Sequence, residues 1–182
     1  IGAGGNTSVT AGSLNNNAGS VTAVGDLSAT IAGAATNVGG TLAANGNTTV
    51  SAASLDNSTG TTAAVNGNLG VTTSDQTISN GGTLQAGGVT TLSNGGLVNQ
   101  GGKVFGNSLS IDTHKNVLDN SANGTLAATT AVAISSGALT NDAGLVQSGG
   151  AMTIDTNGKA LTNTNAANYS SQQGGITSAD TF

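Results

Sequence analysis

The sequence lacks several residue types altogether: its 182 residues include no cysteine, proline, tryptophan, arginine or glutamate. Without cysteine the chain has neither a disulfide framework nor a thiolate metal site. Charged residues make up 6% of the chain and aromatic residues 2%, whereas disordered chains are usually rich in charge and proline. Threonine, valine, isoleucine and leucine at regular positions favour strands instead, so we expect an ordered protein.

Basic residues are scarce: three lysines stand against eight aspartates, which gives a formal net charge of -5. Nucleic acids and anionic membrane surfaces attract basic patches, so we expect neither as a partner. No apolar run reaches the roughly 18 residues that a membrane-spanning helix needs, and we expect no membrane insertion. The chain starts at Ile1 and both starts and ends within a repeat, which we interpret as a segment excised from a longer chain.

A short pattern recurs along the whole chain: an apolar residue, a polar residue and an asparagine, with a glycine following. The asparagines of this pattern are Asn16, Asn37, Asn57, Asn80, Asn99, Asn120, Asn141 and Asn163. The glycines are Gly19, Gly40, Gly60, Gly82, Gly102, Gly124, Gly144 and, later than elsewhere, Gly175. Repeats of about 20 to 22 residues are typical of solenoids, in which each turn stacks on the one before.

Each repeat contains three short segments in which apolar and polar residues alternate. The first segment carries pairs such as Val21/Ala23 and Leu42/Ala44, the second carries pairs such as Leu27/Ala29, and the third carries the asparagine. Alternation of period two predicts half-buried strands. Three short strands and three corners per repeat predict an all-β fold, a right-handed parallel β-helix that forms a single segment over residues 1–182. Small residues at the second inward position predict a narrow interior without a ligand cavity.

The recurrent asparagines have a structural explanation. Asparagine tolerates the left-handed backbone that a sharp corner needs, and its amide satisfies corner backbone groups. Amides stacked one turn apart also hydrogen-bond to each other along the axis. We therefore interpret the eight asparagines as a structural ladder rather than a binding site.

The distance from the second to the third strand alternates between short and long, which predicts a repeating unit of two turns. The longer connections bulge on one edge, at residues 75–76, 114–116 and 157–159, where much of the charge lies. This edge carries the only histidine, His114, beside Lys115. The last repeat has an insertion at residues 164–174 that includes Asn168 and the only tyrosine, Tyr169. Because insertions in solenoids form surface loops, we regard Asn168, Tyr169, His114 and Lys115 as candidate contact residues.

Few residues suit catalysis or metal binding. A serine triad would depend on His114, and no Gly-x-Ser-x-Gly elbow occurs. The calcium-binding repeat Gly-Gly-x-Gly-x-Asp is absent, and the aspartates fall at different phases of the repeat, so they do not converge. The threonine column after the corner glycines lacks the second threonine per turn that a flat ice-binding face needs. We predict no catalytic residues, no cofactor and no metal.

Two stretches carry a family resemblance. GTLAANGNTTVSAASLDNSTG (residues 40–60) and GTLAATTAVAISSGALTNDAG (residues 124–144) resemble the haemagglutinin repeats of filamentous-haemagglutinin-like exoproteins. These are very large Gram-negative proteins of the two-partner secretion route, among them adhesins and the stalks of contact-dependent growth inhibition toxin-delivery proteins. The resemblance covers the whole chain. It implies a β-helix within a secreted cell-surface filament, an outer-membrane secretion partner for the parent, and no catalytic residues.

Three functions remain open from the sequence. The first is a structural rod segment that holds a functional tip away from the cell. The second is an adhesive module that binds a cell-surface receptor or glycan through surface loops. The third, a carbohydrate-active enzyme, is kept because parallel β-helices also host polysaccharide lyases and hydrolases.

Overall fold

The computed structural model describes residues 1–165 and 175–178, in which all regular structure is β-strand arranged on three faces. The first face holds β1 (Gly2–Ala3), β4 (Ser20–Ala23), β7 (Thr41–Ala44), β10 (Thr61–Ala64), β13 (Thr83–Ala86), β20 (Leu145–Ser148) and β23 (Gly175–Ser178). The second holds β2 (Thr7–Ala11), β5 (Leu27–Ile31), β8 (Thr48–Ala52), β11 (Leu69–Thr73), β14 (Val89–Ser93) and β21 (Ala151–Asp155). The third holds β3 (Leu14–Asn15), β6 (Ala34–Thr36), β9 (Ser54–Asp56), β12 (Ile78–Ser79), β15 (Leu97–Val98), β17 (Leu118–Asp119), β19 (Leu139–Thr140) and β22 (Leu161–Thr162).

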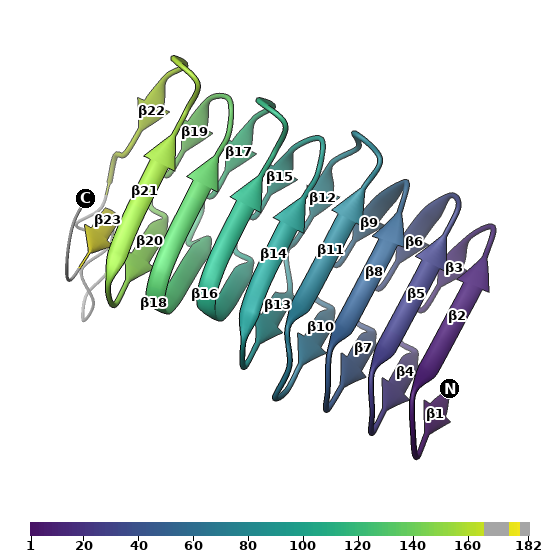
Figure 1. Ribbon diagram of the computed structural model, residues 1–182. Helices are drawn as coiled ribbons and strands as arrows, with labels where there is room; N and C mark the ends of the chain where they lie inside the picture. Colours follow the sequence, from purple (N-terminus) through teal and green to yellow (C-terminus); the bar gives the residue numbers. More distant parts are fainter. Residues whose placement is uncertain (166–174, 179–182) are drawn as a thin grey trace.

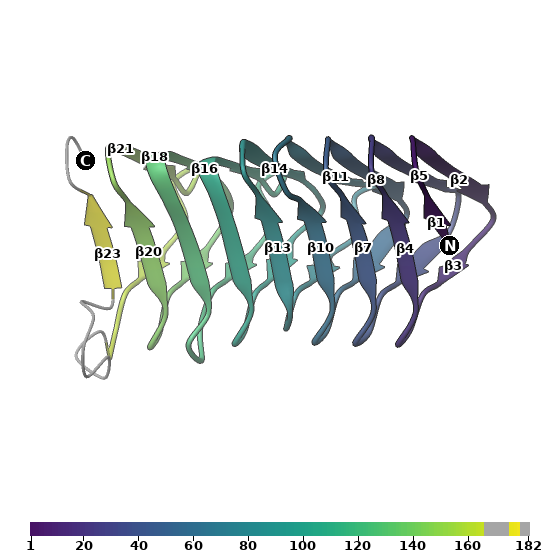
Figure 2. The same cartoon turned by 90° about the horizontal axis from the view of Figure 1, so that it is seen from below.

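The chain winds as a right-handed solenoid, as the sequence predicted. In Figure 1 it rises through the strands of the second face, crosses to the third face behind, and returns through the first face one position further along. Figure 2 shows the strands of the first face side by side. We call the connection from the first to the second face the first corner, that from the second to the third the second corner, and that from the third to the first the third corner.

Two turns depart from the three-strand plan. β16 (Lys103–Asp112) and β18 (Thr125–Ser135) each run without interruption across the first corner, so one strand serves two faces. The expectation of three short strands per turn is wrong for these two turns. Their pairing shifts register between Gly106 and Ser108. A register shift of this kind is a β-bulge, which bends the strand and strengthens its twist, and this allows the strand to turn the corner.

Parallel pairing in register stacks equivalent residues directly above one another. Thr62 lies beside Leu42 on one neighbouring strand and beside Leu84 on the other. The stack continues through Val104 and Leu126 to Val146. Within the described residues these inward positions are almost completely buried, so each turn contributes the same few side chains to one continuous core.

Small residues keep this core narrow. The second inward column of the first face contains Ala23, Ala44, Ala64, Ala86, Gly106, Ala128 and Ser148. Opposite walls approach closely where these residues lie, and the large buried side chains, such as Leu84, Leu109 and Leu118, fill the remaining width. No helix in the described part of the chain is long and apolar enough to cross a membrane.

The strict alternation on the second face yields a stability prediction. Ile134 is 2% exposed in the core, whereas the next residue towards the N-terminus, Ala133, points outward. Replacing Ile134 by aspartate places an unpaired charge in the core, and we expect a loss of more than about 4 kcal/mol in unfolding free energy. Ala133→Asp is the matched control and should change the denaturation midpoint little. Equal midpoints for the two variants would contradict the burial described here.

Candidate functional site

The most regular polar feature is a continuous ladder of asparagine amides inside the third corner. Each Nδ2 donates to the Oδ1 of the asparagine one turn further along, at 2.7 to 2.9 Å. The ladder contains Asn16, Asn37, Asn57, Asn80, Asn99, Asn120, Asn141 and Asn163. From Asn37 to Asn141 the side chains are 0 or 1% exposed, so these amides are satisfied by the protein and not by water.

The same amides also bind the corner backbone. Asn99 Nδ2, for example, lies 3.2 Å from the carbonyl oxygens of Gly102 and Thr125. One side chain therefore joins its own corner, the strand of the next turn and the amide of the next asparagine. An unpaired buried amide is costly, and the ladder leaves each of these donors with a partner.

Glycine is required at these third-corner positions because there is no room for a Cβ atom. A Cβ built on Gly102 would lie 1.9 Å from the carbonyl oxygen of Asn80, and one on Gly60 would lie 1.9 Å from that of Asn37. Gly40, Gly82, Gly124 and Gly144 meet backbone oxygens at 2.0 to 2.3 Å in the same way. The asparagine and glycine columns thus form one unit, because the glycine lets the next turn approach the asparagine of the turn before.

The expectation that the ladder asparagines adopt the left-handed backbone is wrong. The positive φ angles fall two residues later, at Ala18, Gly39, Thr59, Gly101, Ala122, Ala143 and Asn165. The ladder asparagines have no positive φ and direct their amides along the axis, and the turn is made two residues later. A positive φ costs alanine and threonine a modest steric penalty. The stacking of successive turns holds their backbone in this conformation.

A second ladder, which the sequence analysis missed, lies on the surface at the first corner. The side-chain oxygens of Asn6, Asp26, Asn47 and Asn68 each accept the backbone N–H of the equivalent residue in the next turn, at 2.7 to 2.9 Å. This ladder ends at Val89, immediately before the turns in which β16 and β18 cross the corner. In the sequence this ladder is marked by an Asn or Asp at the end of the first corner in each of the early turns.

The second corner bulges every second turn. A threonine closes each long bulge by donating its hydroxyl to the carbonyl three residues later: Thr73 to Gln76, Thr113 to Asn116 and Thr156 to Lys159. Thr73 and Thr113 are buried, and Thr156 is half-buried. Within these bulges Asp75, His114, Lys115 and Asn157 have positive φ. The threonine that precedes each bulge is a sequence signal that the analysis overlooked.

Bulges two turns apart touch across the turn between them. His114 Nδ1 lies 3.1 Å from Asp75 Oδ1, and His114 Nε2 lies 3.1 Å from Ser93 Oγ. This is the connectivity of a Ser-His-Asp triad, but the side chains of His114 and Asp75 are 39% and 85% exposed. A triad needs an oxyanion hole and a substrate pocket beside it, and neither Ser93, His114 nor Asp75 lines any of three hollows found on the described surface. We interpret the three side chains as a clamp between turns.

The two aspartates with a shifted pKa, Asp119 and Asp142, are not set up as general acids. Burial raises the pKa of Asp119, but hydrogen bonds from Ser121 and Gln100 outweigh it and leave this pKa below its usual value. Hydrogen bonds from Thr164 and Asn165 lower the pKa of Asp142. Both groups are thus favoured as carboxylates, the opposite of a general acid. No cluster of three metal-ligating side chains occurs in residues 1–165 and 175–178.

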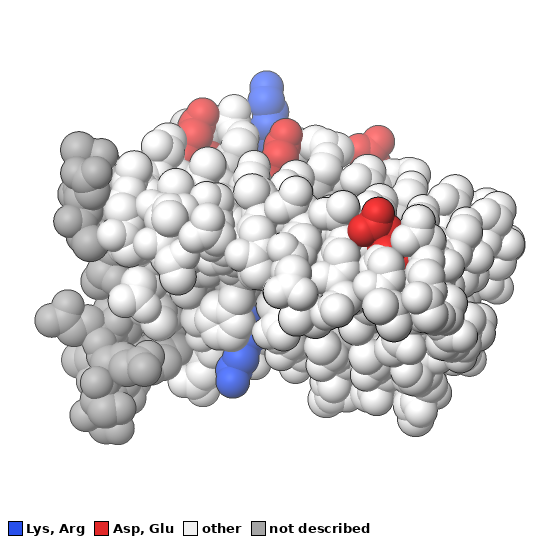
Figure 3. All heavy atoms as spheres, turned by 60° about the horizontal axis from the view of Figure 1, so that its bottom comes forward, with Lys and Arg blue, Asp and Glu red and all other residues white. Residues whose placement is uncertain are grey.

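Two of the four candidate contact residues, His114 and Lys115, fall within the described part of the chain. His114 and Lys115 lie on the exposed second corner. Asn168 and Tyr169, with nearly all of the insertion at 164–174, fall outside the described residues. Figure 3 shows that charged side chains are sparse over the visible surface, which leaves no extended charged patch on that side.

The family follows from the repeat itself. The model of the haemagglutinin repeat matches residues 3–81, 64–104 and 104–181. The chain belongs to the haemagglutinin repeat family. No curated protein and no solved structure matches the chain.

The family and the fold indicate a filamentous, adhesin-like structural segment. In this haemagglutinin-repeat segment the recurrent spacing of asparagine and glycine has a direct geometric basis: both residues of the pattern lie in the third corner, where the close approach of successive turns leaves no room for a Cβ on the glycine. The fold and the family are structural and are not typical of enzymes.

The glycine column is testable by a pair of adjacent substitutions. Gly102→Ala forces its Cβ against the carbonyl oxygen of Asn80, and we expect a loss of about 3 kcal/mol in unfolding free energy. Gly101 has room for a Cβ and differs only in its positive φ, a conformation that Ala122 adopts one turn later. Gly101→Ala should therefore cost about 1 kcal/mol. Denaturation with urea measures both, and a larger loss for Gly101→Ala would contradict the packing explanation.

The ladder is testable by comparing its middle with its end. Asn99→Leu removes a buried amide and leaves Asn120 Oδ1 and two backbone carbonyls short of a donor, which should lower the unfolding free energy by about 3 kcal/mol. Asn163 is exposed and accepts one bond from Asn141, so water can replace it. Asn163→Leu should shift the thermal midpoint only slightly, and equal shifts would show that the ladder does not act as a buried unit.

Proposed function

We propose that this segment is a structural rod within a secreted filamentous exoprotein at the bacterial cell surface, either an adhesin or the stalk of a toxin-delivery protein. The observation that supports this most directly is the unbroken asparagine ladder, which links successive turns from Asn16 to Asn163. Residues that recur with the repeat serve packing or corner formation, so the repeat builds length and stiffness.

The geometry suits such a role. The third face has 8 strands, one per turn, and neighbouring strands lie about 4.8 Å apart. The segment therefore extends about 38 Å along its axis, and every further turn adds the same increment. A core that runs along the whole axis, with amide hydrogen bonds joining the turns, resists bending better than a chain of separate domains joined by linkers.

Secretion through an outer-membrane partner belongs to the same proposal and rests on the family alone. An adhesive role is a second candidate, favoured by the exposed His114 and Lys115, both with left-handed backbone on the bulging edge. In that case a cell-surface receptor or glycan would contact the bulges rather than the repeating columns.

Removing a whole number of turns tests the rod. Deleting residues 41–82 joins Gly40 to Thr83, and Thr83 occupies the register position of Thr41 two turns earlier. We expect the shortened protein to fold cooperatively and its longest dimension, measured by small-angle X-ray scattering, to fall by about 9.6 Å. Deleting residues 41–71 removes a fractional number of turns and should unfold the region.

The same deletion separates the two candidate functions. In the full-length parent, a spacer that loses residues 41–82 should retain adhesion or toxin delivery, because the remaining turns keep their stacking, although His114 loses its partner Asp75. If the deletion variant folds and the parent loses this activity, the segment acts as more than a spacer. His114→Ala and Lys115→Gln in the intact chain then identify whether the bulging edge is responsible, by loss of saturable binding to epithelial or bacterial cells.

A further inference from the structure

One part of the first face breaks the repeat. The outward column beside the core contains Thr22, Ala43, Ala63, Gln85, Phe105, Ala127 and Gln147. The early turns carry small side chains, whereas the later turns carry an aromatic ring between two glutamines. Packing does not require this change, because these side chains point away from the core.

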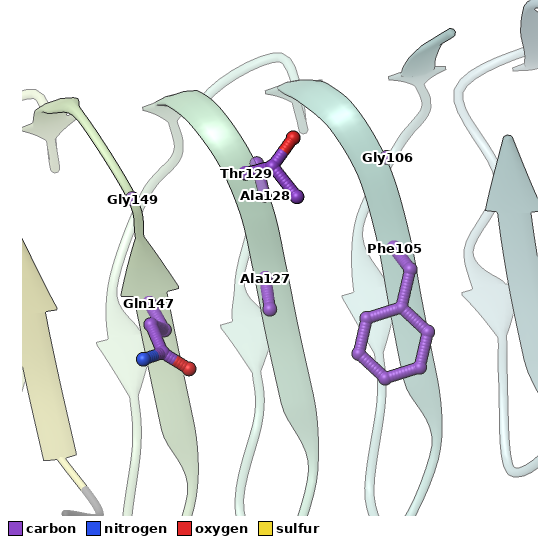
Figure 4. A pocket seen from close by; sticks show the side chains of 7 residues that line it. All are labelled: Phe105, Gly106, Ala127, Ala128, Thr129, Gln147 and Gly149. Carbon is purple, nitrogen blue, oxygen red and sulfur yellow. The ribbon is translucent and has the colours of Figure 1, made fainter. Parts of the chain in front are cut away.

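Phe105 separates two hollows on this face. One, of about 430 Å³, is lined by Phe105, Ala127, Ala128, Thr129 and Gln147 with two glycines. The other, of about 280 Å³, lies on the opposite side of the ring and is lined by Val65, Gln85 and small residues. Figure 4 shows Phe105, Ala127 and Gln147 side by side on successive strands, with Thr129 at the corner above them. The small Ala127 thus leaves a gap between the ring and the amide.

The wall of the larger hollow is fixed. The hydroxyl of Thr129 donates to Asn107 Oδ1 at 2.7 Å, and that of Thr130 donates to the Asn107 carbonyl at 2.7 Å. These bonds join β16 and β18 where both strands cross the first corner and their register shifts. The hollow therefore exists because two turns have continuous strands, and it does not depend on a mobile loop.

A single cation lies on the same face of β16 as the ring. Lys103 is two residues before Phe105 on β16, so both side chains point outward from the same strand. Lys103 is the only charged residue in the described strands of the first face, and no carboxylate of the described residues pairs with it. An exposed lysine without a partner, next to an aromatic ring, is free to attract an anionic group.

We propose that these residues bind a carboxylated oligosaccharide laid along the rod across β13, β16, β18 and β20. The face of an aromatic ring carries negative charge density and attracts the polarised C–H groups of a pyranose. Glutamine amides offer both donors and acceptors to sugar hydroxyls. Lys103 supplies the charge-assisted bond to the carboxylate, and the two hollows accept the sugar units on either side of the stacked one.

This inference goes beyond the rod function and does not depend on it. The rod is tested by whole-turn deletions, whereas the glycan site is tested by point substitutions that leave the length unchanged. Apart from Ala64 and Val65 in the wall of the smaller hollow, the proposed residues lie outside residues 41–82, so the deletion that shortens the rod keeps Lys103, Phe105 and the larger hollow.

Isothermal titration with matched sugars tests the site on the intact chain. The acidic probes are trigalacturonic acid and 3′-sialyllactose, and the neutral counterparts are the methyl ester of the first and lactose. We expect saturable binding of at least one acidic probe, weaker binding of its neutral counterpart, and weakening as the salt concentration rises. Phe105→Ala and Lys103→Gln should each raise the dissociation constant about tenfold.

Controls separate specific binding from general attraction. Lys159→Gln removes one exposed lysine at the second corner and should leave the affinity unchanged. Circular dichroism should show that the Phe105 and Lys103 variants keep the fold, because both side chains point outward. No binding of either acidic probe, equal binding of tri-aspartate, or binding that survives Phe105→Ala would each overturn the proposal.

Discussion

The structure depends on the close approach of successive turns at the third corner. There the carbonyl oxygen of one ladder asparagine lies where the Cβ of the glycine in the next turn would be. The strand spacing of about 4.8 Å also suits an amide-to-amide hydrogen bond between stacked asparagines. All ladder bonds run in the same direction, from Nδ2 to the Oδ1 of the following turn, so each polarises the next. Close packing and hydrogen bonding thus favour one register.

The other two corners are free to vary because the third is fixed. At the second corner a threonine closes a bulge every second turn, and the bulges carry whatever residues the surface allows. At the first corner an exposed Asn/Asp ladder gives way to continuous strands in β16 and β18. The core columns survive both changes, because on either side of the register shift inward residues still pair with inward residues, as Val104 does with Leu126 and Leu109 with Val132. A repeat built in this way can carry different surfaces along one rod.

Features that recur in every turn could be predicted from the sequence. The inward columns, the ladder positions and the two-turn bulges follow from spacing alone. Stacked turns place residues at the same position of successive repeats next to each other. Features that depend on a single turn could not. The contact of His114 with Asp75 requires two bulges to reach across a turn, and the left-handed backbone falls on Ala18 or Thr59, whose types give no hint of it. The hollows beside Phe105 require β16 and β18 to run through the first corner as continuous strands.

Departures from the repeat are therefore the residues to consider for function. A ladder asparagine or a corner glycine is already explained by packing, and a binding role for it would compete with the fold. Phe105 and Lys103 interrupt columns of mostly small residues on the first face and point outward. Because equivalent positions in earlier turns carry alanine, threonine, serine or glutamine and stack equally well, the solenoid would fold without this ring and this charge. Their presence calls for a ligand that the rod itself does not supply.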